Sequence, residues 1–308
     1  HIVDNLCCPI CSGEMRDKSR TLNRKIGRSC ARFLSCSSCG FVRMIPYDST
    51  SLVDQPIDPE DDPASRLRHQ RLHPARLRAL MKYCPPTTHP RVLDYGCATG
   101  EFVSKLRAAG YQAIGVDRNT DSIERAQKRF GDHFKFADSA ESIDEEFDII
   151  VLDHVLEHIQ EPKNFLLTLK DRLTKEGALS IGVPQETSSW NFLLAPPAWM
   201  RKIDNRIVGY VLSLVALLDI NARLAHFTNE HVSNFSAKTI RVLADQTGFE
   251  VMWLDTFLSG SRGVVELCQR HPLVGLVKPL PDFLLSRLAS ITKRGYYIET
   301  LLKSVDPD

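Results

Sequence analysis

The chain has 308 residues, of which 43% are apolar and 25% are charged. This composition is that of an ordinary globular protein, and it excludes a collagen-like fibre, a low-complexity chain and a disordered tail. The 39 Lys and Arg residues are balanced by 38 Asp and Glu residues. Because phosphate binding usually needs a clear basic excess, this balance argues against a protein that mainly coats DNA or RNA, although a local basic patch stays compatible with it.

The hydrophobic runs are too short for a simple membrane span. The longest nearly uncharged run, at 207–218, has 12 residues, where about 20 are needed to cross a bilayer. The first six residues also lack the basic start and long apolar core of a secretory signal. We therefore expect a cytoplasmic protein with one large domain and one small domain, or with two domains.

Cysteine residues are concentrated at the amino-terminal end, where six of the nine lie within the first 39 positions. Four of them form two C-x2-C pairs, and two such pairs on tight turns can face one tetrahedral Zn2+ ion. A pair of disulfides is the competing interpretation, which a reducing compartment disfavours. We therefore predict a zinc ribbon over 1–45, in which Cys7 is an alternative to Cys8. The predicted ligands are Cys8, Cys11, Cys36 and Cys39.

A linker and a helix follow the ribbon. Residues 46–63 are rich in Pro, Asp and Ser, which is typical of a linker. Residues 64–83 have the pattern of an amphipathic helix, with Pro74 as a point of interruption. Its basic side is either a solvated surface or a site for an anionic group such as a phosphate. The apolar side carries Leu67, Leu72, Leu77, Leu80 and Met81, and the basic side carries Arg66, Arg68, Arg71, Arg76 and Arg78.

From residue 91 the chain alternates between strands and helices. A continuous apolar run such as FDIIVL is typical of a strand that is buried inside a parallel sheet. The alternation predicts an α/β fold with helices on both faces of the sheet and a ligand at the carboxyl ends of the strands. The predicted strands are 92–94, 113–116, 134–137, 147–152 and 178–183, and the predicted helices are 101–109, 120–130 and 164–173.

Three features at the ends of successive strands predict a nucleoside pocket. Gly96 and Gly100 lie in a turn whose G-x-x-x-G spacing is neither the dinucleotide fingerprint nor, without a following Lys, a P-loop. Asp117 ends the second strand, where a carboxylate can accept both hydroxyls of a ribose. Asp138 follows the third strand, where a carboxylate can accept from an adenine amino group. Either acid alone is also typical of a helix N-cap, so the prediction depends on the three features together.

The chain also carries longer motifs that resemble a known family. They are VLDYGCATGEF (92–102), IGVDRN (114–119), FKFADSAE (134–141), FDIIVLDHVLEHIQEPKNFL (147–166) and LKDRLTKEGALSIGVP (169–184). With them, the chain resembles the class I S-adenosylmethionine-dependent methyltransferases. The phrase HVLEH, and HVSNFS further on, are most similar to a branch with ubiquinone-type O-methyltransferases and bacterial glycan methyltransferases. The amino-terminal CPIC and CSSCGF resemble the zinc ribbon that many of these enzymes carry.

This resemblance implies a Rossmann-like, seven-stranded methyltransferase sheet whose last strand is antiparallel. It places the methyltransferase domain at 64–270, with an insertion at 186–230 and a carboxyl-terminal amphipathic extension at 271–308. The last two strands would be 251–254 and 264–267. The implied cofactor is S-adenosylmethionine, in addition to Zn2+ in the ribbon.

The implied cofactor contacts follow the strand ends. Asp94, Gly96, Cys97 and Gly100 would lie at the methionine end, Asp117 at the ribose, and Asp138 and Ser139 at the adenine. Asp153 and His154 would face the cofactor. Tyr95 stands where the family often has a small or acidic residue, and Arg118 would stack on adenine or pair with a surface acid.

Methyl transfer to a hydroxyl benefits from a general base, and histidine suits this role near neutral pH. The catalytic candidates are His154, His231 and His158, with His154 and His231 preferred because both should lie at the top of the sheet. His158 comes one helical turn after His154, so both should share a helix face, and its alternative role is to hold the loop. Glu157 is interpreted as structural.

The substrate side is less determined. The insertion at 186–230 contains the apolar run 207–218, which is either a lid, a homodimer contact or a peripheral membrane contact. The basic amphipathic segment 283–302 has the same character. Three functions stay open: a methyltransferase for a hydroxyl of a small molecule or glycan, an RNA or protein methyltransferase whose ribbon binds the macromolecule, and a non-catalytic protein that binds the cofactor. The first is preferred.

Overall fold

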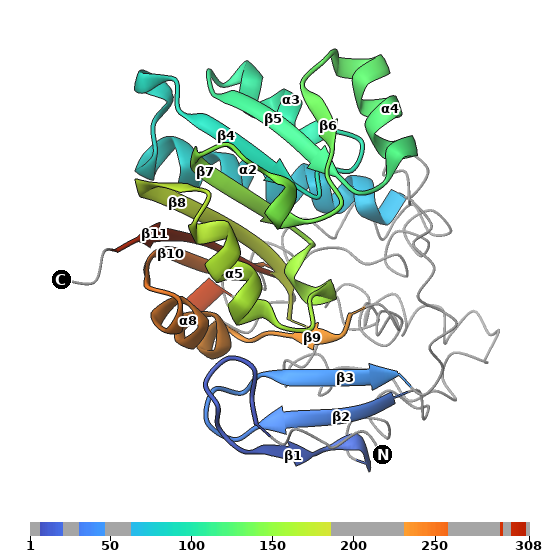
Figure 1. Cartoon of the computed structure of the whole chain (residues 1–308), viewed down its shortest axis with the longest axis vertical. Helices are drawn as coiled ribbons and strands as arrows, with labels where there is room; N and C mark the ends of the chain where they lie inside the picture. Colours follow the sequence, from blue (N-terminus) through green and yellow to red (C-terminus); the bar gives the residue numbers. More distant parts are fainter. Residues whose placement is uncertain are drawn as a thin grey trace, which may run out of the picture.

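The computed structural model describes residues 7–20, 31–46, 63–185, 231–257, 290–291 and 297–305. These residues form a seven-stranded mixed sheet with helices on both faces and a smaller four-stranded antiparallel sheet below it (Figure 1). The predicted α/β fold, with an antiparallel last strand, is confirmed.

The seven-stranded sheet is parallel except for one strand. That strand, β11, lies between β8 and β10 and runs antiparallel to both, whereas the pairs among β4, β5, β6, β7 and β8 are all parallel. In spatial order the strands are β10 (Phe249–Phe257), β11 (Tyr297–Ser304), β8 (Leu173–Pro184), β7 (Phe147–Asp153), β4 (Arg91–Tyr95), β5 (Gln112–Asp117) and β6 (Phe134–Phe136).

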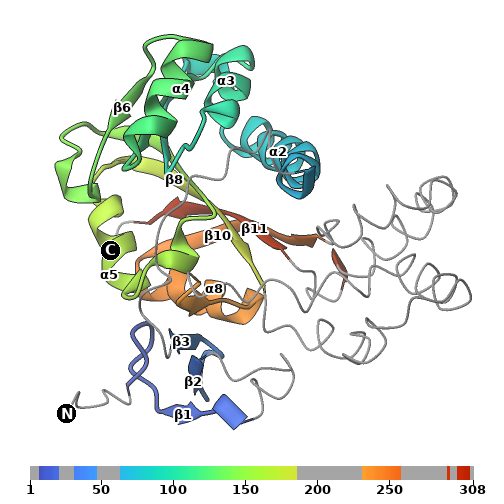
Figure 2. The same ribbon diagram turned by 90° about the vertical axis from the view of Figure 1, so that its right-hand side faces the viewer.

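Two groups of helices cover the two faces of this sheet (Figures 1 and 2). Ile149 and Val151 of β7 pack on one side, and Ile150 and Leu152 pack on the other, which explains why the strand is apolar throughout. The first face is covered by α2 (Pro63–Tyr83), α3 (Glu101–Ala108) and α4 (Thr120–Phe130), and the second by α5 (Pro162–Lys170) and α8 (Ala237–Gln246). Short 3-10 helices are η2 (Pro86–Thr88), η3 (Ala140–Ser142) and η4 (Leu156–His158).

Local signals in the sequence explain where several helices begin. Asn119 caps α4 by accepting a hydrogen bond from the Ser122 backbone N–H at 2.9 Å, and Ser236 caps α8 by accepting from the Thr239 N–H at 3.1 Å. Each cap satisfies a backbone donor that the first helical turn leaves without a partner. Pro162 begins α5, where its missing N–H costs nothing.

The small sheet combines two distant parts of the chain. Its ribbon strands are β1 (Met15–Asp17), β2 (Ala31–Cys36) and β3 (Val42–Pro46), and its fourth strand is β9 (Ser233–Asn234), which comes from just before α8. β3 and β9 pair antiparallel. The amino-terminal ribbon is therefore hydrogen-bonded to the segment that leads into α8, and Figures 1 and 2 show its strands next to α8.

Several boundary predictions need correction. The last strand is Tyr297–Ser304, which lies buried between β8 and β10. The domain therefore does not end at 270. The prediction of an amphipathic segment at 283–302 is wrong for residues 297–302, which belong to this strand. Its polar positions suggested a surface, but Glu299 and Thr300 are buried with hydrogen-bond partners. The helix α2 also runs through Pro74 without interruption.

Other predictions concern segments outside the described residues. They include the linker over 47–62, the insertion 186–230 with its run 207–218, and the predicted strand 264–267. None of the helices in the described parts of the chain has the length and apolarity that crossing a bilayer requires.

Candidate active site and cysteine cluster

The glycine turn between β4 and α3 is tightly enclosed. Gly96 and Gly100 both have a φ of +79°, which side chains rarely adopt. A Cβ on Gly96 would lie 2.5 Å from the Val155 side chain, and one on Gly100 would lie 2.5 Å from the Phe134 ring. The turn therefore accepts only glycine at both positions.

Asp117 organises two turns at the end of β5. Its Oδ2 accepts the Ala98 N–H from the glycine turn at 2.9 Å, and its Oδ1 accepts the Asn119 N–H at 2.9 Å. Each carboxylate oxygen keeps a second acceptor position, which is what a ribose diol requires. The structure thus places Asp117 next to the glycine turn, as the sequence predicts, while the ribose contact itself stays a prediction.

Asp94 has an unused buried acceptor at the end of β4. The residue is 2% exposed, and its Oδ1 makes no hydrogen bond among the described residues. Burial raises its pKa to about 7, the charges of Asp153 and Asp117 add to the rise, and Arg76 opposes it. A buried acceptor without a donor is costly, so this site suits a ligand that brings a donor or a positive charge.

A buried ion cluster lies beside Asp94, and the sequence patterns did not predict it. Arg76 of α2 is fully buried and donates to Asp153 Oδ1 at 2.7 Å and to both carboxylate oxygens of Glu299 at 2.8 Å. Gly182 makes room for it, because a Cβ there would lie 2.1 Å from the guanidinium. Arg76 is therefore not a solvated surface residue, and most of its donors already bind carboxylates. Only its Nη1 has no hydrogen-bond partner among the described residues.

The charges in this cluster hold one another in place. Burial opposes the charged form of Arg76, but Asp153 and Glu299 outweigh it and raise its pKa. Burial likewise opposes ionisation of Asp153, yet Arg76 and His73 hold its pKa well below its usual value. Burial raises the pKa of Glu299 to about 7. The negative charge of Asp153 adds to this rise, and the guanidinium of Arg76 opposes it.

A second connection runs from Asp153 towards α3. His73 Nε2 lies 3.2 Å from Asp153 Oδ2, and its Nδ1 lies 3.0 Å from Lys105 Nζ. The lysine is a donor only, so Nδ1 accepts and Nε2 carries the proton that is donated to Asp153. Asp153, predicted to face the cofactor, is thus tied to α2 through both of its oxygens, and His73 extends the connection to Lys105 of α3.

His154 follows β7 in a strained conformation. Its φ is +58°, which is uncommon for a residue other than glycine and is often found at functional sites. Its backbone N–H donates to the Gly182 carbonyl at 2.9 Å, and its ring packs edge-on to Tyr297 with centroids 5.3 Å apart. The ring therefore lies at the carboxyl ends of β7 and β8 and at the amino end of the antiparallel β11.

The two ring nitrogens of His154 differ. Nδ1 lies 2.8 Å from Glu157 Oε1, while Nε2 is buried and has no hydrogen-bond partner in the described part of the chain. Glu157 is fully buried; burial would raise its pKa, but His154, and then His231 and His158, lower it to about 2. The carboxylate of Glu157 accepts a hydrogen bond from Nδ1–H, so in the neutral ring the lone pair lies on Nε2.

His158 and His231 come together from distant positions. Their rings pack edge-on with centroids 5.0 Å apart, and one ligand atom each from Glu157, His158 and His231 lies within 4.8 Å of the others, close enough to hold a metal ion. The expectation that His158 shares a helix face with His154 is wrong, because His154 lies before the short η4 and has a positive φ.

The remaining predicted contact residues surround the same sheet edge. Tyr95 is half-buried with its ring 5.6 Å from Phe165, and burial raises its pKa. Cys97 is buried, and burial raises the pKa of its thiol, while its contact with the cofactor stays a prediction. Arg118 directly follows β5, and Asp138 and Ser139 follow the neighbouring strand β6. The two strand ends are joined by a hydrogen bond from the Ala137 N–H to the Asp117 carbonyl.

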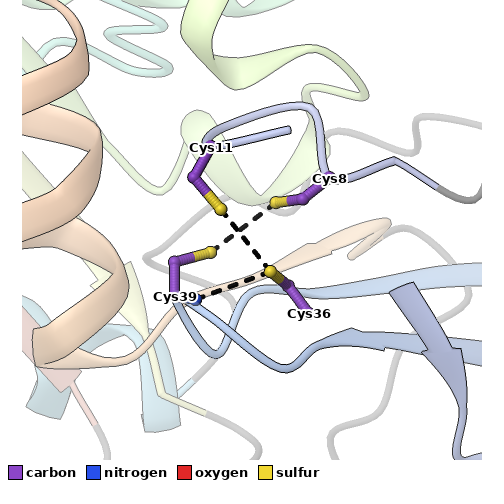
Figure 3. Close-up of side chains that lie close together, drawn as sticks. All are labelled: Cys8, Cys11, Cys36 and Cys39. Atoms are coloured by element: carbon purple, nitrogen blue, oxygen red, sulfur yellow. Dashed lines mark hydrogen bonds between the residues drawn. The ribbon is translucent and has the colours of Figure 1, made fainter. Parts of the chain in front are cut away.

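Four cysteines converge at the ribbon end of the molecule (Figure 3). Cys8 Sγ lies 3.6 Å from Cys39 Sγ, Cys11 Sγ lies 3.5 Å from Cys36 Sγ, and all four sulfurs are within 4.8 Å of one another. A disulfide would need about 2 Å, whereas a tetrahedral zinc ion with bonds of about 2.3 Å separates its sulfurs by about 3.8 Å. Cys7 is exposed and stands outside the cluster.

Comparison with known proteins agrees with this architecture. A seven-stranded sheet with one inserted antiparallel strand, a glycine turn after β4 and an acid after β5 define a nucleoside-binding enzyme of the Rossmann-like type. A family model described as a methyltransferase domain matches residues 66–253. The chain belongs to this family and is a class I S-adenosylmethionine-dependent methyltransferase.

The curated relatives match only part of their own length. The ubiquinone biosynthesis O-methyltransferase of Actinobacillus pleuropneumoniae (serotype 5b, strain L20) is 26% identical over 120 residues, which cover 35% of this chain and 51% of that protein. The tRNA 5-carboxymethoxyuridine methyltransferase of Escherichia coli (strain K12) is 32% identical over 101 residues, which cover 30% and 39%. The chain therefore spans about half or less of these two relatives.

A solved structure extends the similarity of fold. A protein from Galdieria sulphuraria, assigned to the sarcosine dimethylglycine methyltransferases, superposes with a TM-score of 0.52 at 13% identity. The match covers 82% of this chain and 92% of that one. At this level of identity the comparison shows the shared fold alone.

Proposed function

We propose that this methyltransferase acts on a hydroxyl of a small molecule or glycan, with His154 as the general base. The observation that carries the proposal is the His154–Glu157 pair, in which Nδ1 is held at 2.8 Å and the buried Nε2 has no described partner. The partial similarity to ubiquinone biosynthesis O-methyltransferases supports an oxygen acceptor.

The buried groups beside the glycine turn fit the amino-acid end of S-adenosylmethionine. Asp94 Oδ1 offers an acceptor for its ammonium group, and Arg76 Nη1 offers a donor for its carboxylate. Asp117 would accept the ribose hydroxyls, while Asp138 and Ser139 would lie at the adenine. When bound, the cofactor supplies a methyl carbon on a positively charged sulfur, so the leaving group needs no further activation.

The protein's own contribution is proton removal and alignment. The cofactor would supply the methyl group and keep the electron pair of the broken carbon–sulfur bond, and the acceptor hydroxyl would lose its proton. His154 Nε2 takes the proton that the hydroxyl loses, and the ionised Glu157 stabilises the imidazolium that results. Because both residues are held in place before the substrate binds, less entropy is lost when the reacting groups are aligned.

The test of this function is a search for the acceptor. The protein is incubated with methyl-labelled S-adenosylmethionine and a cell extract that is separated into glycan, lipid, RNA and protein fractions. We expect label in a hydroxyl-bearing small molecule or glycan, and strongly reduced label with the His154→Gln variant. Label only in RNA would instead favour the function named for the Escherichia coli relative, and label only in protein would also overturn the proposal.

We further propose that the four-cysteine cluster binds one Zn2+ ion as a structural site. The sulfur separations fit tetrahedral thiolate coordination, and the ribbon strands have only three, six and five residues. Metal analysis should give one zinc per chain, and Cys8→Ser should lose it while Cys84→Ser, at an isolated half-buried cysteine, keeps it. Equal zinc content in both variants would contradict this site.

A further inference from the structure

The ribbon is attached to the methyltransferase domain at β9, which lies just before α8. Arg43 of β3 pairs with Ser233 of β9, and the Met44 N–H donates to the Val232 carbonyl at 2.8 Å. The backbone next to His231 is therefore part of the ribbon sheet. This pairing joins residues nearly two hundred positions apart in the chain.

Side chains from the same two strands hold the loop after β7. Ser233 Oγ donates to the Ile159 carbonyl at 2.5 Å, and Arg43 Nη2 donates to the Gln160 carbonyl at 2.8 Å and to Glu161 Oε1 at 2.6 Å. Three consecutive residues of the loop are thus held by the β3–β9 pair. We call residues 159–161 the clamped segment.

The clamped segment directly continues the catalytic loop. It follows η4, whose last residue His158 packs its ring against His231 at 5.0 Å, and whose buried Glu157 holds Nδ1 of His154. Both sides of the His158–His231 contact are consequently fixed by the ribbon strand: one through the clamped segment and the other through Val232. A shift of this strand moves both histidines.

Further contacts make the attachment rigid. The Phe41 and Phe235 rings lie 5.6 Å apart, and the Thr239 hydroxyl donates to the Cys39 carbonyl at 3.0 Å. Lys238 also donates to the Ser38 carbonyl. These bonds join α8 to the turn that carries the second cysteine pair, so the ribbon is built into the domain instead of being tethered beside it.

We infer that Arg43 is a positioning residue for methyl transfer, and that the ribbon thereby forms part of the acceptor side of the active site. Arg43 touches no reacting atom; it acts by holding the clamped segment, and with it the His154–Glu157–His158 loop, against His231. This inference rests on the proposed function, because it gives the histidines a role in proton transfer to or from the acceptor.

Energetics separate positioning from stability. The Arg43–Glu161 ion pair is partly exposed, with 23% and 54% of the two side chains accessible, and such pairs typically contribute little to stability. A small displacement of catalytic groups can cost up to about 100-fold in rate. Loss of Arg43 should therefore change the rate much more than the stability.

The experiment compares Arg43→Ala with Arg43→Lys and with Arg32→Ala. Arg32 is a matched control, because it lies on β2 of the same ribbon and pairs with Asp17 inside the ribbon. For Arg43→Ala we expect kcat to fall about 10-fold, the acid limb of its pH profile to move, and the KM for S-adenosylmethionine and the zinc content to stay unchanged. Arg43→Lys should recover part of kcat, and Arg32→Ala should behave as the wild type.

A second measurement does not depend on catalysis. In protein with 15N-labelled histidine, Arg43→Ala should shift the ring signals of His158 and His231 and leave those of His89 and His133 in place. Ser233→Ala, which removes only the Oγ bond to Ile159, should shift the same signals and serves if Arg43→Ala fails to fold.

Unchanged kcat, pH profile and histidine signals in folded Arg43→Ala, or in Ser233→Ala in its place, would overturn the inference. A wild-type protein that methylates no hydroxyl would defeat the proposed function. The ring signals would still show whether Arg43 holds the two histidines.

Discussion

Two groups of buried charges lie close to the carboxyl end of β7, and they differ in which polar atoms they leave without a partner among the described residues. Around Arg76, both carboxylates are occupied, and one donor, Nη1, is left without a described partner. Around His154, the buried Glu157 binds one ring nitrogen and the other nitrogen stays a free acceptor. A donor that cannot lose its proton can bind and orient a ligand, whereas a free imidazole nitrogen can also take a proton.

The difference also explains why the two groups tolerate burial. The Arg76 group satisfies nearly all of its charges internally and ties α2, β7 and β11 together. The His154 group is fixed on one side only, in a strained backbone conformation that the surrounding sheet supports. The first arrangement is expected to act mainly on stability and cofactor binding, and the second mainly on the rate of methyl transfer.

The substitution His154→Gln should change the rate of methyl transfer more than any other change proposed for these two groups. The amide keeps a donor for Glu157 but cannot act as a base, so kcat should fall about 10²–10⁴-fold while binding of S-adenosylmethionine in calorimetry is retained. His133→Gln, between α4 and β6, is the matched control and should keep the wild-type rate. Wild-type kcat in His154→Gln would show that another group removes the proton.

The counterpart on the other side is Arg76→Met. Two buried carboxylates then lose their shared cation, so the free energy of unfolding should fall by about 3–5 kcal/mol, as measured by denaturant titration. Arg78→Met, two positions along α2 and exposed, should change it by less than about 0.5 kcal/mol. Combining Arg76→Met with Glu299→Gln should recover part of the loss. Equal stability of the two single variants would mean that the cluster does not stabilise the fold.

The pH dependence of the unfolding free energy should show a smaller effect of the His154 group. The pKa of Glu157 is lowered from its usual 4.5 to about 2, so its contribution to stability is present above pH 4.5 and is lost as the pH falls towards 2. Relative to Glu157→Gln, the wild type should lose up to about 3 kcal/mol of unfolding free energy across this window. Unfolding titrations at a series of pH values measure the difference, and parallel curves for the two proteins would contradict it.

Short-range patterns in the sequence were enough for much of the fold and for parts of the site. The β-α alternation predicted five strands and three helices close to where they lie, and the glycine turn with Asp117 was correctly placed at the strand ends. The two C-x2-C pairs predicted which four cysteines would meet. Each of these signals is contained in a few neighbouring residues, because backbone conformation and side-chain periodicity are local properties.

Other features depended on contacts between distant parts of the chain. No local pattern indicated that Arg76 pairs with Glu299, which is 223 positions away, or that β11 is the last strand of the sheet. It likewise did not predict that β3 would pair with β9 beside His231, or that Glu157 would anchor His154. Burial, ion pairing and strand order are decided by which surfaces pack together, so polar residues that look solvated in the sequence can become the most enclosed groups in the structure.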